Sequence, residues 1–251
     1  MIRVKNLEKS FNNKVVLNDI NVSFETGKTN LIIGRSGSGK TVLLKSIAGL
    51  HDPDKGEVWF DDVLFNKLDF NAKKEIRKEM GMLFQGSALF DSLSVEQNVR
   101  FPLDMFTDKS FEEKTERVNF CLNRVNIINA NKLFPSELSG GMKKRVAIAR
   151  AIALNPKYLF CDEPNSGLDP VTAILIDELI KELTEEYSMT TIVNTHDMNS
   201  VIEIGESIVF INEGNICWEG NKNEILHSDC AILNDFVFAN AMAKHLLTPG
   251  K

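Results

Sequence analysis

The chain has 251 residues, of which 43% are hydrophobic and 25% charged, as in an ordinary globular protein. Its formal net charge of -6 argues against a surface dedicated to nucleic acid, so we expect no nucleic-acid partner. No apolar run approaches the roughly 18 residues of a membrane-spanning helix, and residues 1–5 lack the apolar stretch of a signal peptide. The four cysteines lack metal-ligand spacing and are typical of reduced thiols.

The first 26 residues predict antiparallel strands. Apolar residues alternate intermittently from Val16 to Phe24, and Asn12 with Asn13 gives a turn signal. Residues 56–60 resume the strand pattern farther along the chain. We therefore expect a small antiparallel flank built mostly from the N-terminal part of the chain.

A glycine-rich loop follows the next strand. Residues 30–33 are a short apolar run, typical of a buried strand, and the sequence GRSGSGKT comes directly after it. Apolar residues then recur at helical spacing from Val42 to Leu50. This strand–loop–helix context fits the pattern GxxxxGK[ST], whose backbone N–H groups and helix N-terminus cradle phosphates. The predicted nucleotide-binding residues here are Gly34, Arg35, Ser36, Gly37, Ser38, Gly39, Lys40, Thr41 and Val42.

Two side chains at the end of this loop have further predicted roles. We expect Lys40 to reach the β- and γ-phosphates of ATP, and the Thr41 hydroxyl to ligate Mg²⁺. The alternative is a chance turn rich in glycine and serine. The strand before the loop and the helix after it favour the phosphate site, so the sequence predicts ATP and Mg²⁺ as cofactors.

The region from about residue 85 to 154 has a helical pattern. Ser110 and Glu113 have the spacing of a capping box, and apolar residues follow at i, i+3, i+4 and i+7 from Val118. Pro156 ends the last of these helices. A helical insertion is therefore expected in the middle of the chain.

Two acidic residues end the buried strand that begins at Tyr158. Asp162 is placed to hold Mg²⁺ directly or through water, and Glu163 can polarise the water that attacks a γ-phosphate. The alternative is an acidic helix cap beyond a strand. The phosphate loop earlier in the chain favours the catalytic interpretation.

The remaining elements complete an α/β pattern. Asp169 and Pro170 begin a helix as N-cap and first residue, a strand follows at residues 191–193, and a hairpin spans 207–218. Alternating strands and helices predict a mostly parallel sheet, with a small antiparallel β flank and an inserted helical subdomain.

A second glycine-rich motif, LSGGM, occupies residues 138–142. Ser139 is expected at the start of a helix, where its hydroxyl, the following N–H groups and the helix dipole form an anion site. Of the three basic residues that follow, Lys143, Lys144 and Arg145, we expect a solvated helix face, with phosphate contact as the alternative.

Together these motifs resemble the ATP-binding subunits of ABC transporters, over essentially the whole chain. The resemblance implies a P-loop NTPase core, with an ATPase domain at 1–230, its helical subdomain at about 86–155, and a C-terminal tail at 231–251 that packs on its own core or contacts the second subunit. It also implies that the signature acts on ATP bound to a second, identical subunit. The resemblance implies that Phe11 stacks on adenine, with plain core packing as the alternative, and that Gln85 senses Mg²⁺ and the attacking water. It implies γ-phosphate contact for the signature residues Ser139, Gly140 and Gly141 and for the switch residue His196. Asp169 would lie in a loop that crosses between subunits.

Met142 replaces the usual glutamine of the signature. This SGGM sequence and the stretch at residues 81–91 are similar to the ATPases of Mla and MCE-linked phospholipid transporters. That resemblance implies phospholipid transport that maintains outer-membrane lipid asymmetry, at the cytoplasmic face of the inner membrane. The implied partners are integral-membrane permease subunits and an MCE-type lipid-binding protein. Phe90 and Leu93 are apolar candidates for the permease contact, with packing in the interior as the alternative for each.

Two other functions stay open at this point. One is the ATPase subunit of another ABC system, for lipoprotein release, cell division or solute uptake. The other is an ABC ATPase that acts on ribosomes or in DNA repair. Met142 argues against the first, and the presence of only one set of motifs argues against the second.

Overall fold

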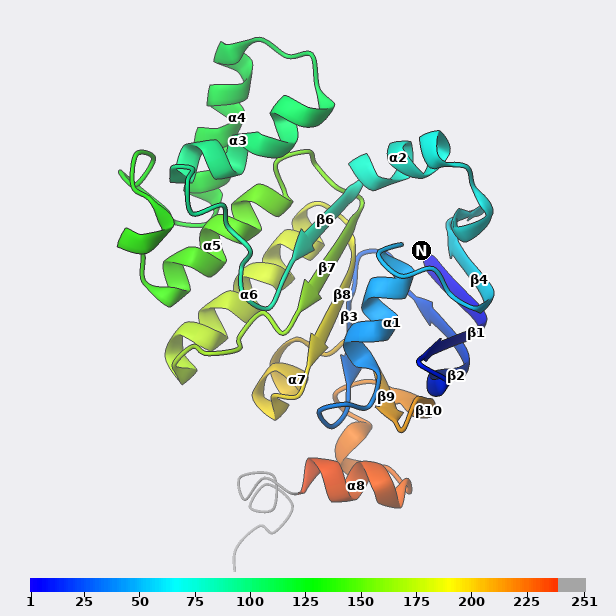
Figure 1. Ribbon diagram of the computed structural model, residues 1–251. Helices are drawn as coiled ribbons and strands as arrows, with labels where there is room; N and C mark the ends of the chain where they lie inside the picture. The colour runs from blue at the N-terminus through cyan, green and yellow to red at the C-terminus, as the bar shows by residue number, and fades with distance from the viewer. Residues whose placement is uncertain (239–251) are drawn as a thin grey trace, which may run out of the picture.

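A six-stranded sheet forms the centre of the computed structural model, which describes residues 1–238 (Figure 1). Its strand order is β10-β9-β3-β8-β7-β6, and every neighbouring pair except β9 and β10 is parallel. The expected mostly parallel sheet is confirmed. The strands are β3 (Thr29–Ile33), β6 (Met80–Leu83), β7 (Tyr158–Asp162), β8 (Thr190–Thr195), β9 (Ser207–Asn212) and β10 (Asn215–Gly220).

A four-stranded antiparallel sheet flanks the central one, in the order β2-β1-β4-β5. Its strands are β1 (Ile2–Phe11), β2 (Lys14–Phe24), β4 (Lys55–Phe60) and β5 (Val63–Leu64). Asn12 and Asn13 join the first two strands with φ of 49° and 62°. Two residues with positive φ match a two-residue hairpin turn, for which asparagine is well suited. The predicted antiparallel flank and its turn are confirmed.

Helices cover the central sheet, and three of them form the expected insertion between β6 and β7. The helices are α1 (Lys40–Ile47), α2 (Phe70–Lys78), α3 (Val95–Phe106), α4 (Phe111–Arg124), α5 (Gly140–Ala151), α6 (Pro170–Glu186), α7 (Met198–Ile204) and α8 (Ala231–Val237). Short 3-10 turns lie at Phe65–Lys67, Pro135–Glu137 and Ile225–His227. The capping box at Ser110 and the N-cap at Asp169 form as expected. Helices α3, α4 and α5 lie together beyond one side of the sheet (Figure 1).

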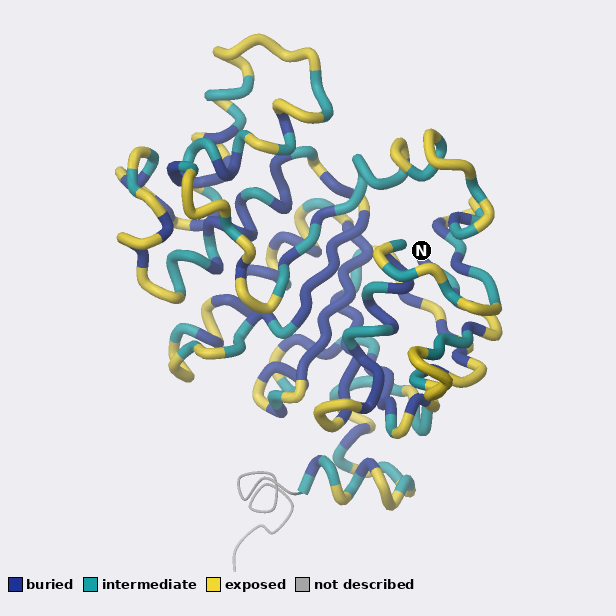
Figure 2. The backbone as a smooth tube through the Cα atoms, in the orientation of Figure 1, coloured by how far each residue is buried: buried dark blue, intermediate teal, exposed yellow. Residues whose placement is uncertain are grey.

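Successive residues of the central strands face two different cores. On β3, Leu31 and Ile33 belong to the core that α6 shares with the inserted helices, whereas Ile32 belongs to the core formed with α1 and the antiparallel sheet. Strands β3, β7 and β8 are buried along their length, as the dark tube at the centre of Figure 2 shows. Burial on both faces explains why these strands are continuous apolar runs in the sequence.

The carboxyl ends of the parallel strands define where chemistry can occur. Gly34 follows β3, Gln85 lies two residues after β6, Asp162 ends β7 and His196 follows β8. Ligand sites in open α/β sheets lie outside this edge. None of the helices in residues 1–238 combines the length and the hydropathy that crossing a membrane requires. Part of the expected tail lies in α8, and residues 239–251 lie outside the described residues.

Candidate active site

The glycine-rich loop connects β3 to α1 in a conformation that glycine permits. Gly34 has φ of 151°, and a Cβ at this position would lie 2.2 Å from the carbonyl oxygen of Ile211. Gly39 is the N-cap of α1 with φ of 112°. The loop therefore turns tightly onto the helix N-terminus, where backbone N–H groups are available to a phosphate.

Lys40 begins α1 and folds back over this loop. Its buried Nζ donates to the carbonyl oxygens of Gly34, at 2.8 Å, and Arg35, at 3.2 Å, and lies 4.0 Å from Oε1 of Glu163. Burial lowers the pKa of Lys40, and the charges of Glu163 and Asp162 partly oppose that shift. The ammonium is thus held where the loop curves, a position suited to a phosphate oxygen.

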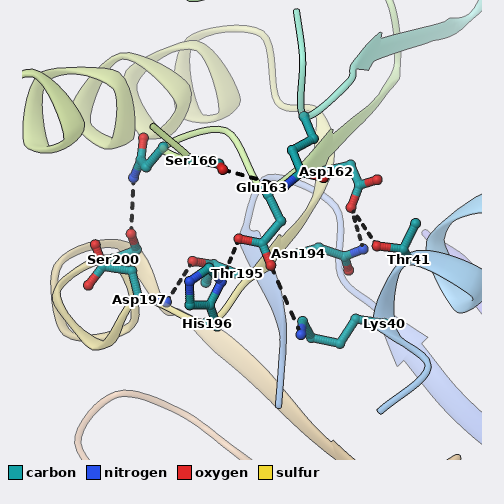
Figure 3. Close-up of polar contacts among 12 residues, drawn as sticks. Lys40, Thr41, Asp162, Glu163, Ser166, Asn194, Thr195, His196, Asp197 and Ser200 are labelled. Atoms are coloured by element: carbon teal, nitrogen blue, oxygen red, sulfur yellow. Dashed lines mark hydrogen bonds and ion pairs between the residues drawn. The ribbon is translucent and has the colours of Figure 1, made fainter. Parts of the chain in front are cut away.

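Asp162 connects α1, β7 and β8 through a single oxygen. Its Oδ1 accepts hydrogen bonds from Oγ1 of Thr41, at 3.0 Å, and from Nδ2 of Asn194, at 3.1 Å (Figure 3). Asn194 is fully buried, and its own Oδ1 has no hydrogen-bond partner among the described residues. A hydroxyl, a carboxylate and an unpartnered amide oxygen are hard ligands, which fit a divalent cation or its bound water.

Glu163 lies beside Asp162 with a left-handed backbone, at φ of 50°. Its N–H donates to the carbonyl oxygen of Asn194 at 3.0 Å, and its Oε2 lies 2.7 Å from Nδ1 of His196 (Figure 3). The Glu163 side chain is 13% exposed, whereas that of His196 is 57% exposed. This pairing places a largely buried carboxylate next to an open cavity.

That cavity has a volume of about 620 Å³. Its lining includes Arg35, Glu163 and His196, together with Phe236 from α8. Gln85 is exposed at the edge of the sheet, and its Nε2 donates to Oγ of Ser166, a neighbour in the cavity wall, at 3.4 Å. The structure therefore gathers the predicted residues Lys40, Thr41, Gln85, Asp162, Glu163 and His196 around one end of the sheet.

The signature residues line a different cavity, of about 440 Å³. Ser139 is the N-cap of α5, as expected, and its Oγ accepts from the N–H of Met142 at 3.2 Å. Gly140 and Gly141 lie beside it in the cavity wall, and Met142 packs partly against the core. Among residues 1–238, only Gly167 lines both cavities. Within one chain, the signature and the phosphate loop do not share a cavity.

The structure gives the environments of two residues that the sequence did not settle or predicted wrongly, Phe11 and Lys144. Phe11 is 40% exposed, with its ring 5.4 Å from that of His51 and 5.2 Å from Nζ of Lys9, so it is not part of the core. The expected solvated face at residues 143–145 is wrong for Lys144, which is buried against the core. Burial also lowers the pKa of Lys144.

Three contributors to the site were not identified from the sequence. They are Asn194, which holds Asp162; Ser166, which holds Gln85; and Lys144. An amide side chain directly after the apolar pair Ile192 and Val193 of a predicted strand was a signal for Asn194. Nothing in the local pattern distinguishes Lys144 from its basic neighbours.

The fold and the site define an ATP-binding subunit of the ABC transporter class. The family model described as ABC transporter matches residues 17–166, and the chain belongs to this family and is an ATPase. It is 40% identical over 228 residues to the intermembrane phospholipid transport system ATP-binding protein MlaF of Haemophilus influenzae, covering 91% of this chain and 86% of that protein. The expected ABC family and its P-loop fold are thereby confirmed.

Two further similarities extend this result. The chain is 41% identical over 228 residues to the methionine import ATP-binding protein MetN of Carboxydothermus hydrogenoformans, covering 90% of this chain and 67% of that protein. It also matches the solved structure of the dimeric ATP-binding cassette MJ0796 in a post-hydrolysis state with ADP and Pi. The TM-score is 0.80 at 35% identity, with 88% of this chain and 99% of the other covered.

Proposed function

We propose that this ATPase drives phospholipid transport that maintains outer-membrane lipid asymmetry. The observation that carries the proposal is the similarity to MlaF over 91% of the chain, which includes the segment with Met142 in its signature. The location that goes with this function is the cytoplasmic face of the inner membrane, with an MCE-type lipid-binding protein as a partner. Solute uptake is the second candidate, because the identity to MetN is equally high.

In this proposal the phosphate chain of ATP lies along the loop from Gly34 to Thr41. Lys40 neutralises the β- and γ-phosphates, and its buried position in the loop supports that role. Mg²⁺ is held by Thr41 and Asp162, with Gln85 nearby. The shared hydrogen bond of Thr41 and Asp162 supports this placement, because it brings two oxygen ligands together.

Glu163 then acts as the residue that polarises the attacking water, and His196 contacts the γ-phosphate. Their 2.7 Å contact beside the open cavity supports both roles. A positioned carboxylate within reach of a water is the requirement for general-base assistance. Phe11 stacks on adenine, which its exposed ring allows.

The signature completes the site of a second copy of this chain. Ser139, Gly140 and Gly141 line a cavity separate from their own phosphate loop, so they contact the γ-phosphate bound by a partner subunit. The dimeric state of the MJ0796 structure supports a homodimer. Each ATP then lies between two subunits.

An apolar cavity of about 390 Å³ is the proposed contact for the permease. Phe90 and Phe101 line it, with ring centroids 4.7 Å apart, and both are partly exposed. Leu93, also expected at this contact, is partly buried and does not line the cavity. An apolar helix end from a membrane partner would cover these rings.

The decisive experiment is native purification of the complex, followed by mass spectrometry of the small molecules that it retains. We expect phospholipid and a membrane permease, and loss of the gene should raise detergent sensitivity. Recovery of methionine or another solute, with an intact outer-membrane barrier, would favour the second candidate. Recovery of ribosomes or DNA would contradict both.

A further inference from the structure

Lys144 is a charged residue that the fold removes almost completely from water. It lies in α5, five residues after Ser139, and is only 4% exposed. Lysine is almost never fully buried without a partner, because removing an ammonium from water is costly. A methionine could fill the same volume without that cost. A specific function is therefore required to explain the charge.

The ammonium of Lys144 joins two other segments of the site to its own helix. Nζ donates to the carbonyl oxygen of Gln85 and, at 3.4 Å, to that of Glu163. Both hydrogen-bond acceptors belong to the backbone, so Lys144 holds these segments in position, and its ammonium also interacts with the charges of Asp162 and Glu163. An ammonium has three donors and can serve both carbonyls at once.

The hydrogen bond from Lys144 matters most at Glu163, because the backbone there has an uncommon conformation. Its φ of 50° is uncommon for a residue with a side chain. Its N–H donates to the carbonyl oxygen of Asn194, and its own carbonyl oxygen accepts from the N–H of Ser166, at 3.2 Å, and from Nζ of Lys144, at 3.4 Å. These three contacts fix the peptide groups around the carboxylate that faces His196.

A second residue of α5, Arg150, also hydrogen-bonds to the segment after Gln85. Arg150 donates to the carbonyl oxygens of Ser87, at 2.9 Å, and Ala88, at 2.8 Å. Arg150 makes no hydrogen bond to Glu163, whereas Lys144 does. Of these two residues of α5, it is Lys144 that connects the signature helix to Glu163, which follows Asp162 at the end of β7.

We propose that Lys144 is a positioning residue that links the signature helix to the backbone at Gln85 and Glu163. Ser139 contacts ATP that is bound to the partner subunit. Through Lys144, this contact sets the position of Glu163 in the subunit to which Ser139 belongs. The inference rests on the proposed homodimer and extends it, because it names the connection between the two cavities.

The test replaces Lys144 by Met, with Lys143→Met, the preceding position of α5, as the matched control. We expect Lys144→Met to lower kcat at least tenfold, about 1.4 kcal/mol, while the Kd for ATP stays unchanged. Its melting temperature should be equal or higher, since an apolar residue avoids the desolvation of a buried charge. Lys143→Met should stay within twofold of the wild-type kcat. A Lys144→Met kcat within threefold of that control would overturn the proposal.

Two further variants make the result decisive. Lys144→Gln retains donors without charge, so we expect an intermediate kcat, and the same threefold criterion applies to it if Lys144→Met does not fold. In a Glu163→Gln background, Lys144→Met should still form the ATP-dependent dimer, which shows that binding and association are intact. If Glu163→Gln alone forms no dimer, the proposed function fails, whereas the kcat comparison still decides the role of Lys144.

Discussion

The phosphate loop and the signature motif are both glycine-rich and both begin a helix, yet their surroundings differ. Lys40 and Asp162 are buried, and their polar atoms bond to other parts of the same chain. Ser139 and Gly140 are exposed, and within the described part of the chain the Ser139 hydroxyl hydrogen-bonds only to its own helix. The phosphate-loop region is therefore assembled by contacts within one chain, whereas the hydrogen-bond donors of the signature motif are at the surface. This difference supports the proposal that the signature acts on ATP held by a second subunit.

The largest effect is expected from the phosphate-loop side. Lys40→Ala or Asp162→Asn should lower ATP hydrolysis by about 10³–10⁵-fold, to an undetectable rate, since each removes charge that faces phosphate or Mg²⁺. Steady-state phosphate release from the assembled complex measures this. Lys45→Ala, later in α1, serves as the control. Near-normal turnover in either variant would contradict the assignment of this region.

Glu163→Gln should separate ATP binding from hydrolysis. Glutamine keeps the shape of the side chain but cannot take a proton from water, so we expect about 10²–10⁴-fold slower turnover. The variant should accumulate as a dimer that encloses two ATP molecules, as size-exclusion chromatography with ATP and Mg²⁺ would show. Glu213→Gln, in an exposed hairpin turn, is the control. A monomeric and fully active Glu163→Gln protein would refute the catalytic role.

Ser139→Arg tests the outward-facing region directly. The bulky side chain should block the γ-phosphate of the partner subunit while its own phosphate loop still binds ATP. A mixed dimer of Ser139→Arg with Lys40→Ala retains one intact composite site in principle, so about half of the sites can close. Nucleotide crosslinking to each subunit measures this. Loss of ATP only from the loop of the Ser139→Arg subunit would argue against a shared site.

The smallest effect concerns Asp177, a buried residue of α6 near the loop between the two cavities. Burial raises its pKa from 3.8 to about 6, although Ser200 and Asn165 oppose this shift. The folded state therefore binds the proton more tightly than the unfolded state, so ionisation costs stability as pH rises from about 4 to 6. At pH 7.5 the cost is about 3 kcal/mol, and at pH 4 it is nearly absent.

Asp177→Asn should remove that cost. We expect higher stability than the wild type at pH 7.5 and equal stability near pH 4, measured by urea unfolding across this range. An amide can also donate to Oδ1 of Asn165, which has no hydrogen-bond partner in residues 1–238. Asp229→Asn, outside this cluster, controls for the loss of one charge. Equal pH dependence in the wild type and Asp177→Asn would show that Asp177 is not the titrating group.

Local patterns in the sequence were sufficient for the elements of the site that are contiguous. The phosphate loop, the N-cap at Ser139 and the acidic pair each depend on a few neighbouring residues and their backbone geometry. Their order along the chain also indicated the family. The roles of the individual residues, including adenine stacking by Phe11, remain predictions.

The sequence by itself determined the α/β fold, because strands buried on both faces and amphipathic helices leave periodic apolar patterns. It also determined the loop that cradles phosphate, because that conformation depends on local glycines. Only the tertiary structure decided that Asn194 bonds to Asp162, that Lys144 is buried against Gln85 and Glu163, and that Ser139 faces a separate cavity. These contacts join residues from different elements, and which side chains meet depends on how helices and strands pack, which no local pattern records.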